Sequence, residues 1–201
     1  MIFDKSVGHL RAKYPFKADP AILIDNGKEA LACQKSQEKR QIKNNTHSQY
    51  QEQFQDMINC GVVEEISPQE LSQYSGPINW ITHHEVHKPG SLSTPVRLVS
   101  NSSFRNGKTN LNDLMIKGPN TLADLFNNLL KFRGYEVGLV YDITKAYNSM
   151  WTGLVEKHIR RLWMRMNQEE EWKLYGFSCV QFGDQPAATI MTIAVKKASE
   201  T

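Results

Sequence analysis

The segment LVYDITKAYNSM, residues 139–150, carries the most informative pattern in the chain. Its first residues are apolar, β-branched or aromatic, which predicts a strand. The strand would end in one carboxylate, Asp142, followed by a turn that carries Lys145 and Tyr147. A carboxylate at the C-terminal end of an apolar strand often takes part in catalysis or metal binding, since mixed sheets place their sites there. An aspartate that only caps the following turn is the alternative.

The residues before this segment predict a hairpin. INWITHHEVHK (78–88) and PVRLVSNSS (95–103) have the composition of two strands, joined by a turn at residues 89–94. Three histidines fall within five residues of the first strand, and His83 and His87 have the i, i+4 spacing of a helical zinc site. The intervening glutamate is one place too late for that motif, and the flanks favour a strand. We therefore prefer a solvated or substrate-facing strand over zinc binding.

A helix and a further strand are predicted between the hairpin and Asp142. TLADLFNNLLKFRG (121–134) has its apolar residues on one stripe, with Asn120 as the N-cap and Gly134 as the C-cap. The segment EVGLVYDI (136–143) then predicts the next strand. The helical stripe consists of Leu122, Leu125, Phe126 and Leu129.

The residues after this segment continue the alternation of helix and strand. Residues 153–166 are ambiguous between the two, and residues 169–181 predict a strand. FGDQP (182–186) predicts a turn, and residues 187–200 predict a helix. The start of that helix either binds an anion through its backbone N–H groups or forms an ordinary corner of the fold.

The N-terminal part is predicted to be mainly helical. Residues 1–24 read as irregular, residues 25–60 as two helices and residues 62–66 as a short strand, with Gly61 ending the second helix. The apolar face of that second helix consists of Tyr50, Phe54, Met57 and Ile58.

These elements together predict an α+β fold with a soft boundary near residue 75. Residues 1–75 form a helical lead-in, and residues 76–201 form the mixed part. The chain has 201 residues, enough for one domain or for a domain with a smaller appendage.

Composition favours a soluble globular protein with no membrane partner. Hydrophobic residues make up 40% and charged residues 22%, and the net charge of +3 fits an acidic partner without requiring one. No apolar run reaches the ~20 residues that span a bilayer, and no signal peptide is recognisable. Cys33, Cys60 and Cys179 lie far apart, which favours a reducing compartment. We therefore predict a cytoplasmic location.

A basic run lies around the predicted hairpin. Lys88, Arg97, Arg105 and Lys108 occur between residues 86 and 111. Such a run is either a solvated face or a set of cations that converge on phosphates, where arginine offers a bidentate fork. The pattern alone leaves both interpretations open.

Four of these segments, in this order, resemble the reverse transcriptases of BEL/Pao-type LTR retrotransposons, a class of transposable element. The segment at 83–103 is similar to the fingers hairpin of that family, and LNDLMIKGPNTLADLFNNLLKFR (111–133) to its next block. VYDITKAYNSM (140–150) resembles polymerase motif A, and VQFGDQPAATIMTIAVKKASE (180–200) resembles the motif B region. The resemblance covers roughly residues 14–201. It implies right-hand polymerase-like fingers and a partial palm, with a helical N-terminal segment.

The resemblance assigns roles to individual residues. Asp142 matches the first metal-binding, catalytic aspartate, and Ile143 matches the residue whose backbone carbonyl joins the metal. Tyr147 matches the ring that excludes a ribose 2′-hydroxyl, the group that separates RNA from DNA building blocks. The implied contacts to the nucleotide and template come from the fingers and from the turn before the last helix, at Lys88, Arg97, Gly183, Asp184, Gln185 and Pro186.

The activity implied is RNA-directed DNA polymerisation by two-metal nucleotidyl transfer. Two Mg²⁺ (or Mn²⁺) ions about 4 Å apart would activate the primer 3′-hydroxyl and stabilise the leaving pyrophosphate. The implied partners are an RNA or DNA template-primer and deoxynucleoside triphosphates.

One part of the family pattern is missing from the sequence. The 201 residues contain no Tyr-x-Asp-Asp, the motif that would share the metals with Asp142. We therefore expect a fragment, inactive by itself, of a longer polymerase. The alternative is a remnant or co-opted module that binds nucleic acid or protein without catalysis. An unrelated phosphate-binding α/β domain that shares these motifs by chance is the third possibility.

Overall fold

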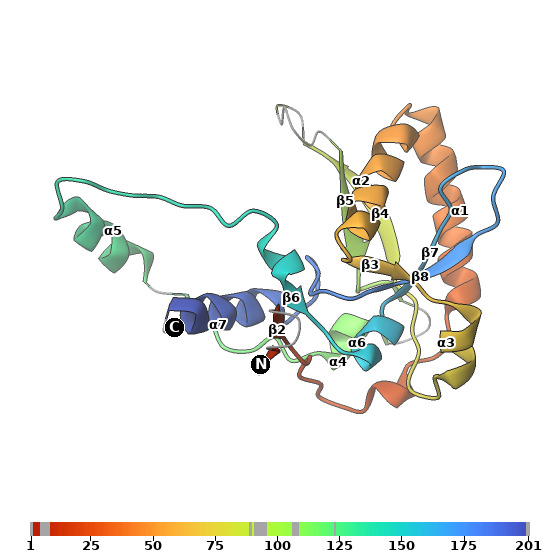
Figure 1. The fold of residues 1–201 in the computed structure, drawn as a ribbon, viewed down its shortest axis with the longest axis horizontal. Coiled ribbons are helices and arrows are strands. Elements are labelled where there is room, and N and C mark those ends of the chain that lie inside the picture. The colour runs from red at the N-terminus through yellow and green to blue at the C-terminus, as the bar shows by residue number, and fades with distance from the viewer. Residues whose placement is uncertain are drawn as a thin grey trace.

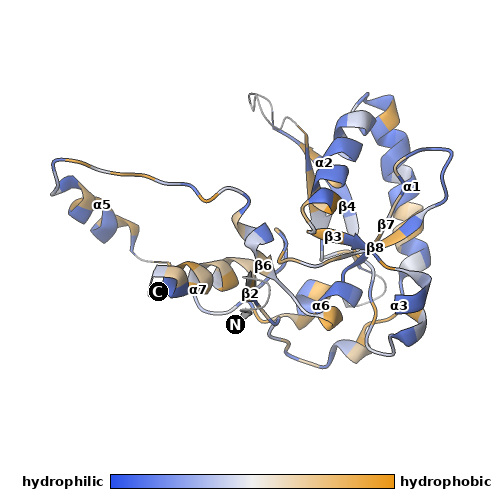
Figure 2. Ribbon diagram, viewed as in Figure 1, coloured by the Kyte–Doolittle hydropathy of each residue, from blue (hydrophilic) through white to orange (hydrophobic). Residues whose placement is uncertain are grey.

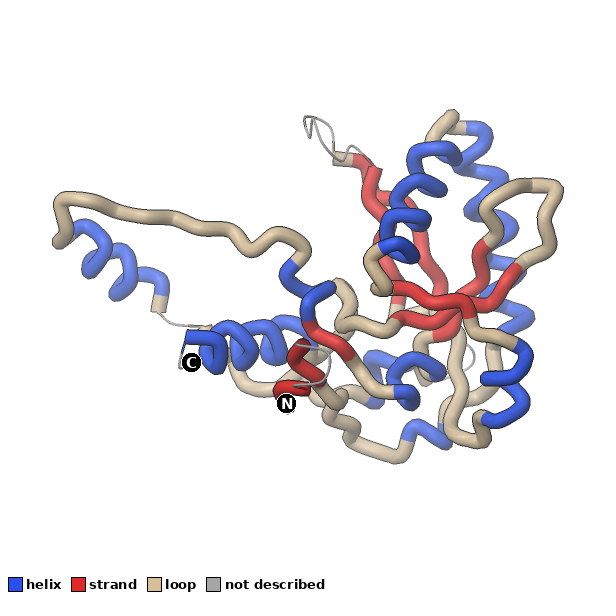
Figure 3. The backbone as a smooth tube through the Cα atoms, viewed as in Figure 1, coloured by secondary structure: helices blue, strands red, loops and turns tan. Residues whose placement is uncertain are grey.

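The protein has a mixed α+β fold, as the sequence predicted. The computed structural model describes residues 2–4, 9–88, 90, 96–105, 109–122 and 124–199, and within them it contains seven α-helices and eight short strands (Figures 1 and 3). The helices are α1 (Gly27–Lys43), α2 (His47–Asn59), α3 (Pro68–Gln73), α4 (Leu111–Leu114), α5 (Leu125–Arg133), α6 (Leu154–His158) and α7 (Ala187–Ser199), with 3-10 turns η1 (Pro20–Ile22) and η2 (Ala146–Ser149). The strands are β1 (Ile2–Asp4), β2 (His9–Arg11), β3 (Val63–Glu65), β4 (Thr82–His87), β5 (Val96–Asn101), β6 (Met150–Trp151), β7 (Arg161–Met164) and β8 (Lys173–Phe177).

The centre of the fold is the antiparallel sheet β3-β8-β7, with the hairpin β4-β5 beside it. An isolated parallel bridge joins Trp80, two residues before β4, to Arg161 of β7, and so connects the hairpin to the sheet. Helices α1 and α2 pack on these strands, and Phe54 of α2 meets Tyr175 of β8 edge to face, with ring centroids 5.0 Å apart. The helical lead-in therefore shares its core with strands of the C-terminal half, because β8 is the partner of β3 among the strands that the structure describes.

The predicted hairpin is confirmed. β4 and β5 pair in antiparallel register from Thr82↔Asn101 to His87↔Val96. Residues 89 and 91–94 of its predicted turn lie outside the described residues, as does Lys108 of the basic run. The second predicted helix is also confirmed, since Tyr50 and Phe54 of α2 are completely buried.

Two local predictions need correction, and the structure resolves a third segment that the sequence left ambiguous. The first 24 residues include the strands β1 and β2, and β2 pairs in parallel with β6. The sequence SPQEL (67–71) predicts a turn, but residues 68–73 form helix α3, because Ser67 caps the helix through the Glu70 N–H and Pro68 occupies its first position. The ambiguous segment at 153–166 contains both elements, α6 followed by β7.

Residues 124–145, which we call the arm, extend away from the rest of the fold (Figure 1). Helix α5 ends at Gly134 as predicted, but its N-cap is Asp124 instead of Asn120, and no residue of α5 is buried. The predicted strand at 136–143 is wrong, since this segment pairs with no described strand and its side chains are exposed. Figure 2 shows apolar residues along the arm.

No helix among the described residues is long and apolar enough to cross a membrane. A cytoplasmic location stays a prediction.

Candidate functional site

Three segments that the sequence singled out meet at one place in the fold. The end of β5, the turn at 181–186 and the 3-10 turn η2 come together there. The Ser100 hydroxyl donates to the carbonyl of Phe182 at 2.9 Å. The rings of Tyr147 and Phe182 lie with their centroids 4.2 Å apart. The fold thus joins the hairpin, the segment after Asp142 and the start of α7.

Position 183 of this turn accepts only glycine without strain. Gly183 has a φ of +94°, in the region that side chains with a Cβ rarely adopt. A Cβ at this position would also lie 3.1 Å from the carbonyl oxygen of Ser100. Asn112 of α4 holds the turn from the other side, because its side-chain amide donates to the Gly183 carbonyl at 2.8 Å.

Asp184 is predicted to contact the nucleotide, but the structure buries its side chain completely. Its carboxylate pairs with Arg160, which is also fully buried, at 3.2 Å. The hydroxyls of Tyr14 and Ser102 both donate to the same carboxylate. Burial raises the pKa of the Tyr14 phenol well above its usual value, so this group stays a neutral donor. Asp184 therefore anchors the turn, and its carboxylate is not presented to solvent.

Gln185 and Pro186 continue this anchoring. The Gln185 N–H donates to the side-chain oxygen of Asn112 at 2.9 Å. The carbonyl of Pro186 accepts the first-turn bond from the N–H of Ile190 in α7, at 3.0 Å. Asn112 therefore binds the turn at two successive residues, Gly183 and Gln185. The sequence pattern did not single out Asn112, because its role depends on a contact about 70 residues away.

Tyr147 is half-buried on η2, where it packs against the main core. Lys145 begins this turn in the left-handed region, with a φ of +51°. Phe182, which contacts the Tyr147 ring, keeps 66% of its surface exposed. An aromatic residue directly before the glycine of a predicted turn is the signal that would have pointed to Phe182 from the sequence.

Arg97 and Lys88 are exposed on the hairpin. Successive side chains of a strand point to opposite faces, so Arg97 points away from the face that carries Ser100. The face that carries Ser100 packs against α1 and α2, where the partly buried side chain of Leu98 contacts the core. Arg97 therefore lies on the face that these helices do not cover. Arg105 lies 3.6 Å from Asp113 in an exposed ion pair.

Asp142 and Ile143 are exposed in the arm and are not at the end of a strand. Among the described residues, no group of three or more histidine, cysteine, aspartate or glutamate side chains is placed to hold a metal ion. One carboxylate cannot hold two Mg²⁺ ions, which need several oxygen ligands each. The residues present therefore do not fit a two-metal centre by themselves.

The histidines of the hairpin do not form a zinc site. His83 is buried, its Nε2 donates to the Trp163 carbonyl at 2.9 Å, and the Tyr50 hydroxyl donates to its Nδ1. Burial lowers the His83 pKa to about 4, so the ring is neutral at pH 7. The prediction of a solvated strand is wrong for His83 and holds for His87, which is exposed and lies 3.3 Å from Glu85.

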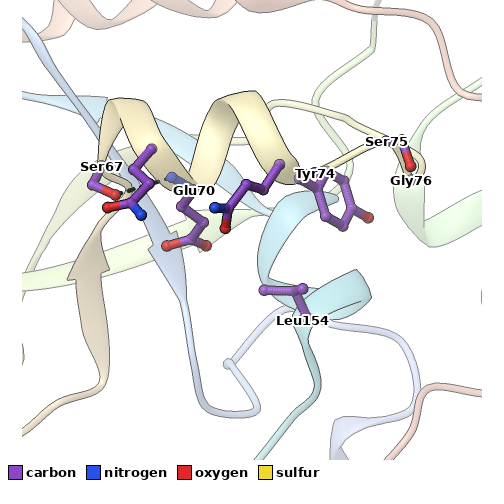
Figure 4. A pocket seen from close by; sticks show the side chains of 8 residues that line it. Ser67, Glu70, Tyr74, Ser75, Gly76 and Leu154 are labelled. Carbon is purple, nitrogen blue, oxygen red and sulfur yellow. Dashed lines mark hydrogen bonds between the residues drawn. The ribbon is translucent and has the colours of Figure 1, made fainter.

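A separate pocket of about 400 Å³ lies at α3 and the start of α6 (Figure 4). Glu70 projects from α3 beside it and binds Lys157 at 3.1 Å and His158 at 3.1 Å. Burial lowers the His158 pKa to about 4, and the Tyr74 ring stacks on it at 3.6 Å. These groups bind one another and come from elements outside the predicted site. We therefore assign them to the stability of the α3–α6 corner.

Comparison with models of known protein families and with curated proteins finds no match for this chain. The resemblance to reverse transcriptases therefore stays a prediction from the sequence.

Proposed function

We propose that this chain is the fingers and first palm portion of an RNA-directed DNA polymerase, and that it binds a template-primer and a deoxynucleoside triphosphate. The chain by itself is expected to be inactive as a polymerase, because no Tyr-x-Asp-Asp accompanies Asp142. A cytoplasmic location is part of the proposal, in line with three cysteines that form no disulfide.

One observation carries the proposal: the hairpin, η2 and the turn before α7 converge. The resemblance assigns nucleotide contacts to these three segments. In the sequence, Tyr147 of η2 lies about 50 residues after the hairpin and about 35 residues before the turn. Their convergence rests on the contact of Ser100 with Phe182 and on the ring pair of Tyr147 and Phe182. Unrelated segments that matched the family by chance would have no reason to meet.

The two rings at this place, and an arginine on the other face of the hairpin, have chemistry that a nucleotide or template-primer can use. Tyr147 and Phe182 offer aromatic surface for a sugar or base. Arg97 lies outside this place, since it offers its guanidinium to phosphate oxygens on the opposite, uncovered face of the hairpin. Asp184 contributes through the backbone of the turn that it anchors, since its carboxylate is bound to Arg160.

The second candidate is a binding module without catalysis. It is favoured by the position of Asp142, which lies in the arm with no described cluster of acidic ligands around it. Such a module would bind nucleic acid or protein but would not respond to a nucleotide.

The test is fluorescence anisotropy with a labelled template-primer, with and without the next complementary deoxynucleoside triphosphate. We expect binding that tightens with the correct triphosphate and not with a mismatched one. Tyr147→Ala, Phe182→Ala and Arg97→Ala should each reduce that tightening about 5-fold or more, the scale of one stacking contact or one charged hydrogen bond.

The matched control is Lys173→Ala, which removes an exposed cation of β8 that pairs with Glu65. It should leave the response to the triphosphate unchanged. Binding without any response to the triphosphate would support the non-catalytic module instead. Primer extension by this chain alone, abolished by Asp142→Asn, would show that the expected inactivity is wrong.

A further inference from the structure

The arm exposes far more apolar surface than a stable surface segment normally does. Eleven large apolar side chains between residues 125 and 143 are each at least 45% exposed. An aromatic side chain alone can bury 150–250 Å², so the arm presents on the order of 1,000 Å² of apolar surface. The largest apolar patch on an ordinary monomer is about 300–600 Å² and is often a binding site. The eleven residues are Leu125, Phe126, Leu129, Leu130, Phe132, Tyr135, Val137, Leu139, Val140, Tyr141 and Ile143.

The second half of the arm also has a backbone without partners. No hydrogen bond joins the backbone of residues 135–143 to any other described residue. This segment is rich in valine, tyrosine, leucine and isoleucine, the residues that favour strands. An exposed, unpaired segment of this composition is a template on which another strand can pair.

The pattern of this segment separates two faces. Side chains at Val137, Leu139, Tyr141 and Ile143 would share one face of a strand, and all of them are apolar. The other face would carry Glu136, Gly138, Val140, Asp142 and Thr144. The ring of Phe132 from α5 already lies against Gly138, where a Cβ would approach it to 2.2 Å. The polar face is therefore partly covered within the chain, while the apolar face is open.

We propose that two copies of this chain associate through the arm, with residues 137–143 of each copy pairing as antiparallel strands about a two-fold axis at Val140. The inference does not depend on the proposed function. The side chains of the apolar face would pack against their counterparts across the two strands, while α5 of each copy would stay on the face that carries Gly138, where the Phe132 ring already lies. Because part of the apolar face stays open, the surface removed from solvent by two arms would be on the order of 1,000 Å², about the lower limit for a specific interface.

The register follows from symmetry and charge. A two-fold axis normal to the ribbon keeps each side chain on its own face, so an interface of this kind is self-complementary. An axis at Val140 places Leu139 opposite Tyr141 of the second copy and Val137 opposite Ile143 of the second copy. These pairs join apolar side chains, which stabilise a sheet.

The two neighbouring registers are less favourable. An axis at Leu139 would oppose Asp142 with Glu136 of the second copy, and like charges directly opposite each other are destabilising. An axis at Tyr141 would bring Val137 to Lys145 of the second copy, whose left-handed φ of +51° cannot continue a strand, so Val137 would have no apolar partner. Val140 is therefore the centre that the sequence favours.

The test combines mass measurement with site-specific disulfide formation. Light scattering after size exclusion should give twice the 23.0 kDa mass of the chain. Cysteines are then placed one at a time in a Cys33→Ser, Cys60→Ser background, which removes the two native thiols that are not buried. Under mild oxidation, Val140→Cys should form a disulfide-linked dimer at least 5-fold faster than Leu139→Cys or Tyr141→Cys. A mixture of the last two proteins should form the mixed dimer.

Val140→Pro is the matched control, because it removes the N–H and disfavours pairing in a segment that contacts no core residue. It should give a monomer with unchanged near-ultraviolet circular dichroism. A monomeric wild-type chain would overturn the proposal. Equal cross-linking at all three positions, or large heterogeneous aggregates, would also overturn it, since either result means association without this register.

Discussion

Replacing Asp184 by asparagine should destabilise the fold by about 3 kcal/mol, because the change leaves Arg160 as a buried charge without a counter-charge. Both side chains are completely buried, with their nearest charged atoms 3.2 Å apart. Arg160 would keep neutral acceptors, including the Cys179 carbonyl and the Thr152 hydroxyl at 2.7 Å each. Asparagine keeps the shape of the side chain and one acceptor oxygen, so the loss is mainly that of the negative charge.

The assay is urea unfolding followed by tryptophan fluorescence, where the stacked pair of Trp80 and Trp163 reports on the core. For a chain of this size, 1 kcal/mol shifts the melting temperature by about 2–4 °C, so Asp184→Asn should melt roughly 6–12 °C lower. The control is Lys173→Met, which removes one partner of a half-exposed pair at 3.4 Å and should cost less than about 1 kcal/mol.

The double variant Arg160→Met, Asp184→Leu separates charge from packing. It removes both charges at once, so it should be less destabilised than the sum of the two single changes. If Asp184→Asn unfolds within 1 kcal/mol of the wild-type chain, the reasoning is refuted. In that case the carbonyl groups around Arg160 would be enough to stabilise its charge.

Three further predictions follow from local geometry. Gly183→Ala should lower the free energy of unfolding in urea by about 1–2 kcal/mol, because the φ of residue 183 is +94° and an alanine Cβ would lie 3.1 Å from the Ser100 carbonyl oxygen. An unchanged free energy of unfolding would contradict this reasoning. Burial lowers the His83 pKa from 6.5 to about 4, so the unfolded chain binds a proton between these pH values that the folded chain does not. Stability should therefore be complete above pH 6.5 and fall by about 3 kcal/mol as the pH drops to 4, with a flatter profile in His83→Gln. In thiol labelling, exposed Cys60 should react in the native state, while buried Cys179, whose pKa burial raises to about 12, should react only on unfolding.

Local patterns predicted the elements whose partners are near in sequence or whose residues have strong preferences. The hairpin β4-β5 and helix α2 form as expected, since alternation and 3.6-residue periodicity describe their buried faces. Helix α5 also forms, because Asp124 and Gly134 cap it without help from tertiary contacts. What its apolar stripe would face could not be predicted, because that depends on a partner surface.

The segment at 136–143 shows why strand preference alone is a weak predictor. Its residues have high strand propensity, but a strand forms only when another backbone supplies hydrogen bonds. None of the described residues does so here. The buried pair of Arg160 and Asp184 was missed for a related reason, since a charged residue in a sequence is first expected at the surface.

The turn before α7 also shows how a motif can be explained by packing. Gly183 is required by its backbone conformation, Asp184 by Arg160 and Gln185 by the contact of its N–H with Asn112. The identities of these residues therefore cannot by themselves argue for nucleotide binding. The exposed surface of Phe182 beside the ring of Tyr147 has no such structural reason. A functional role for this region rests on those two rings, and they are the positions at which binding should be tested.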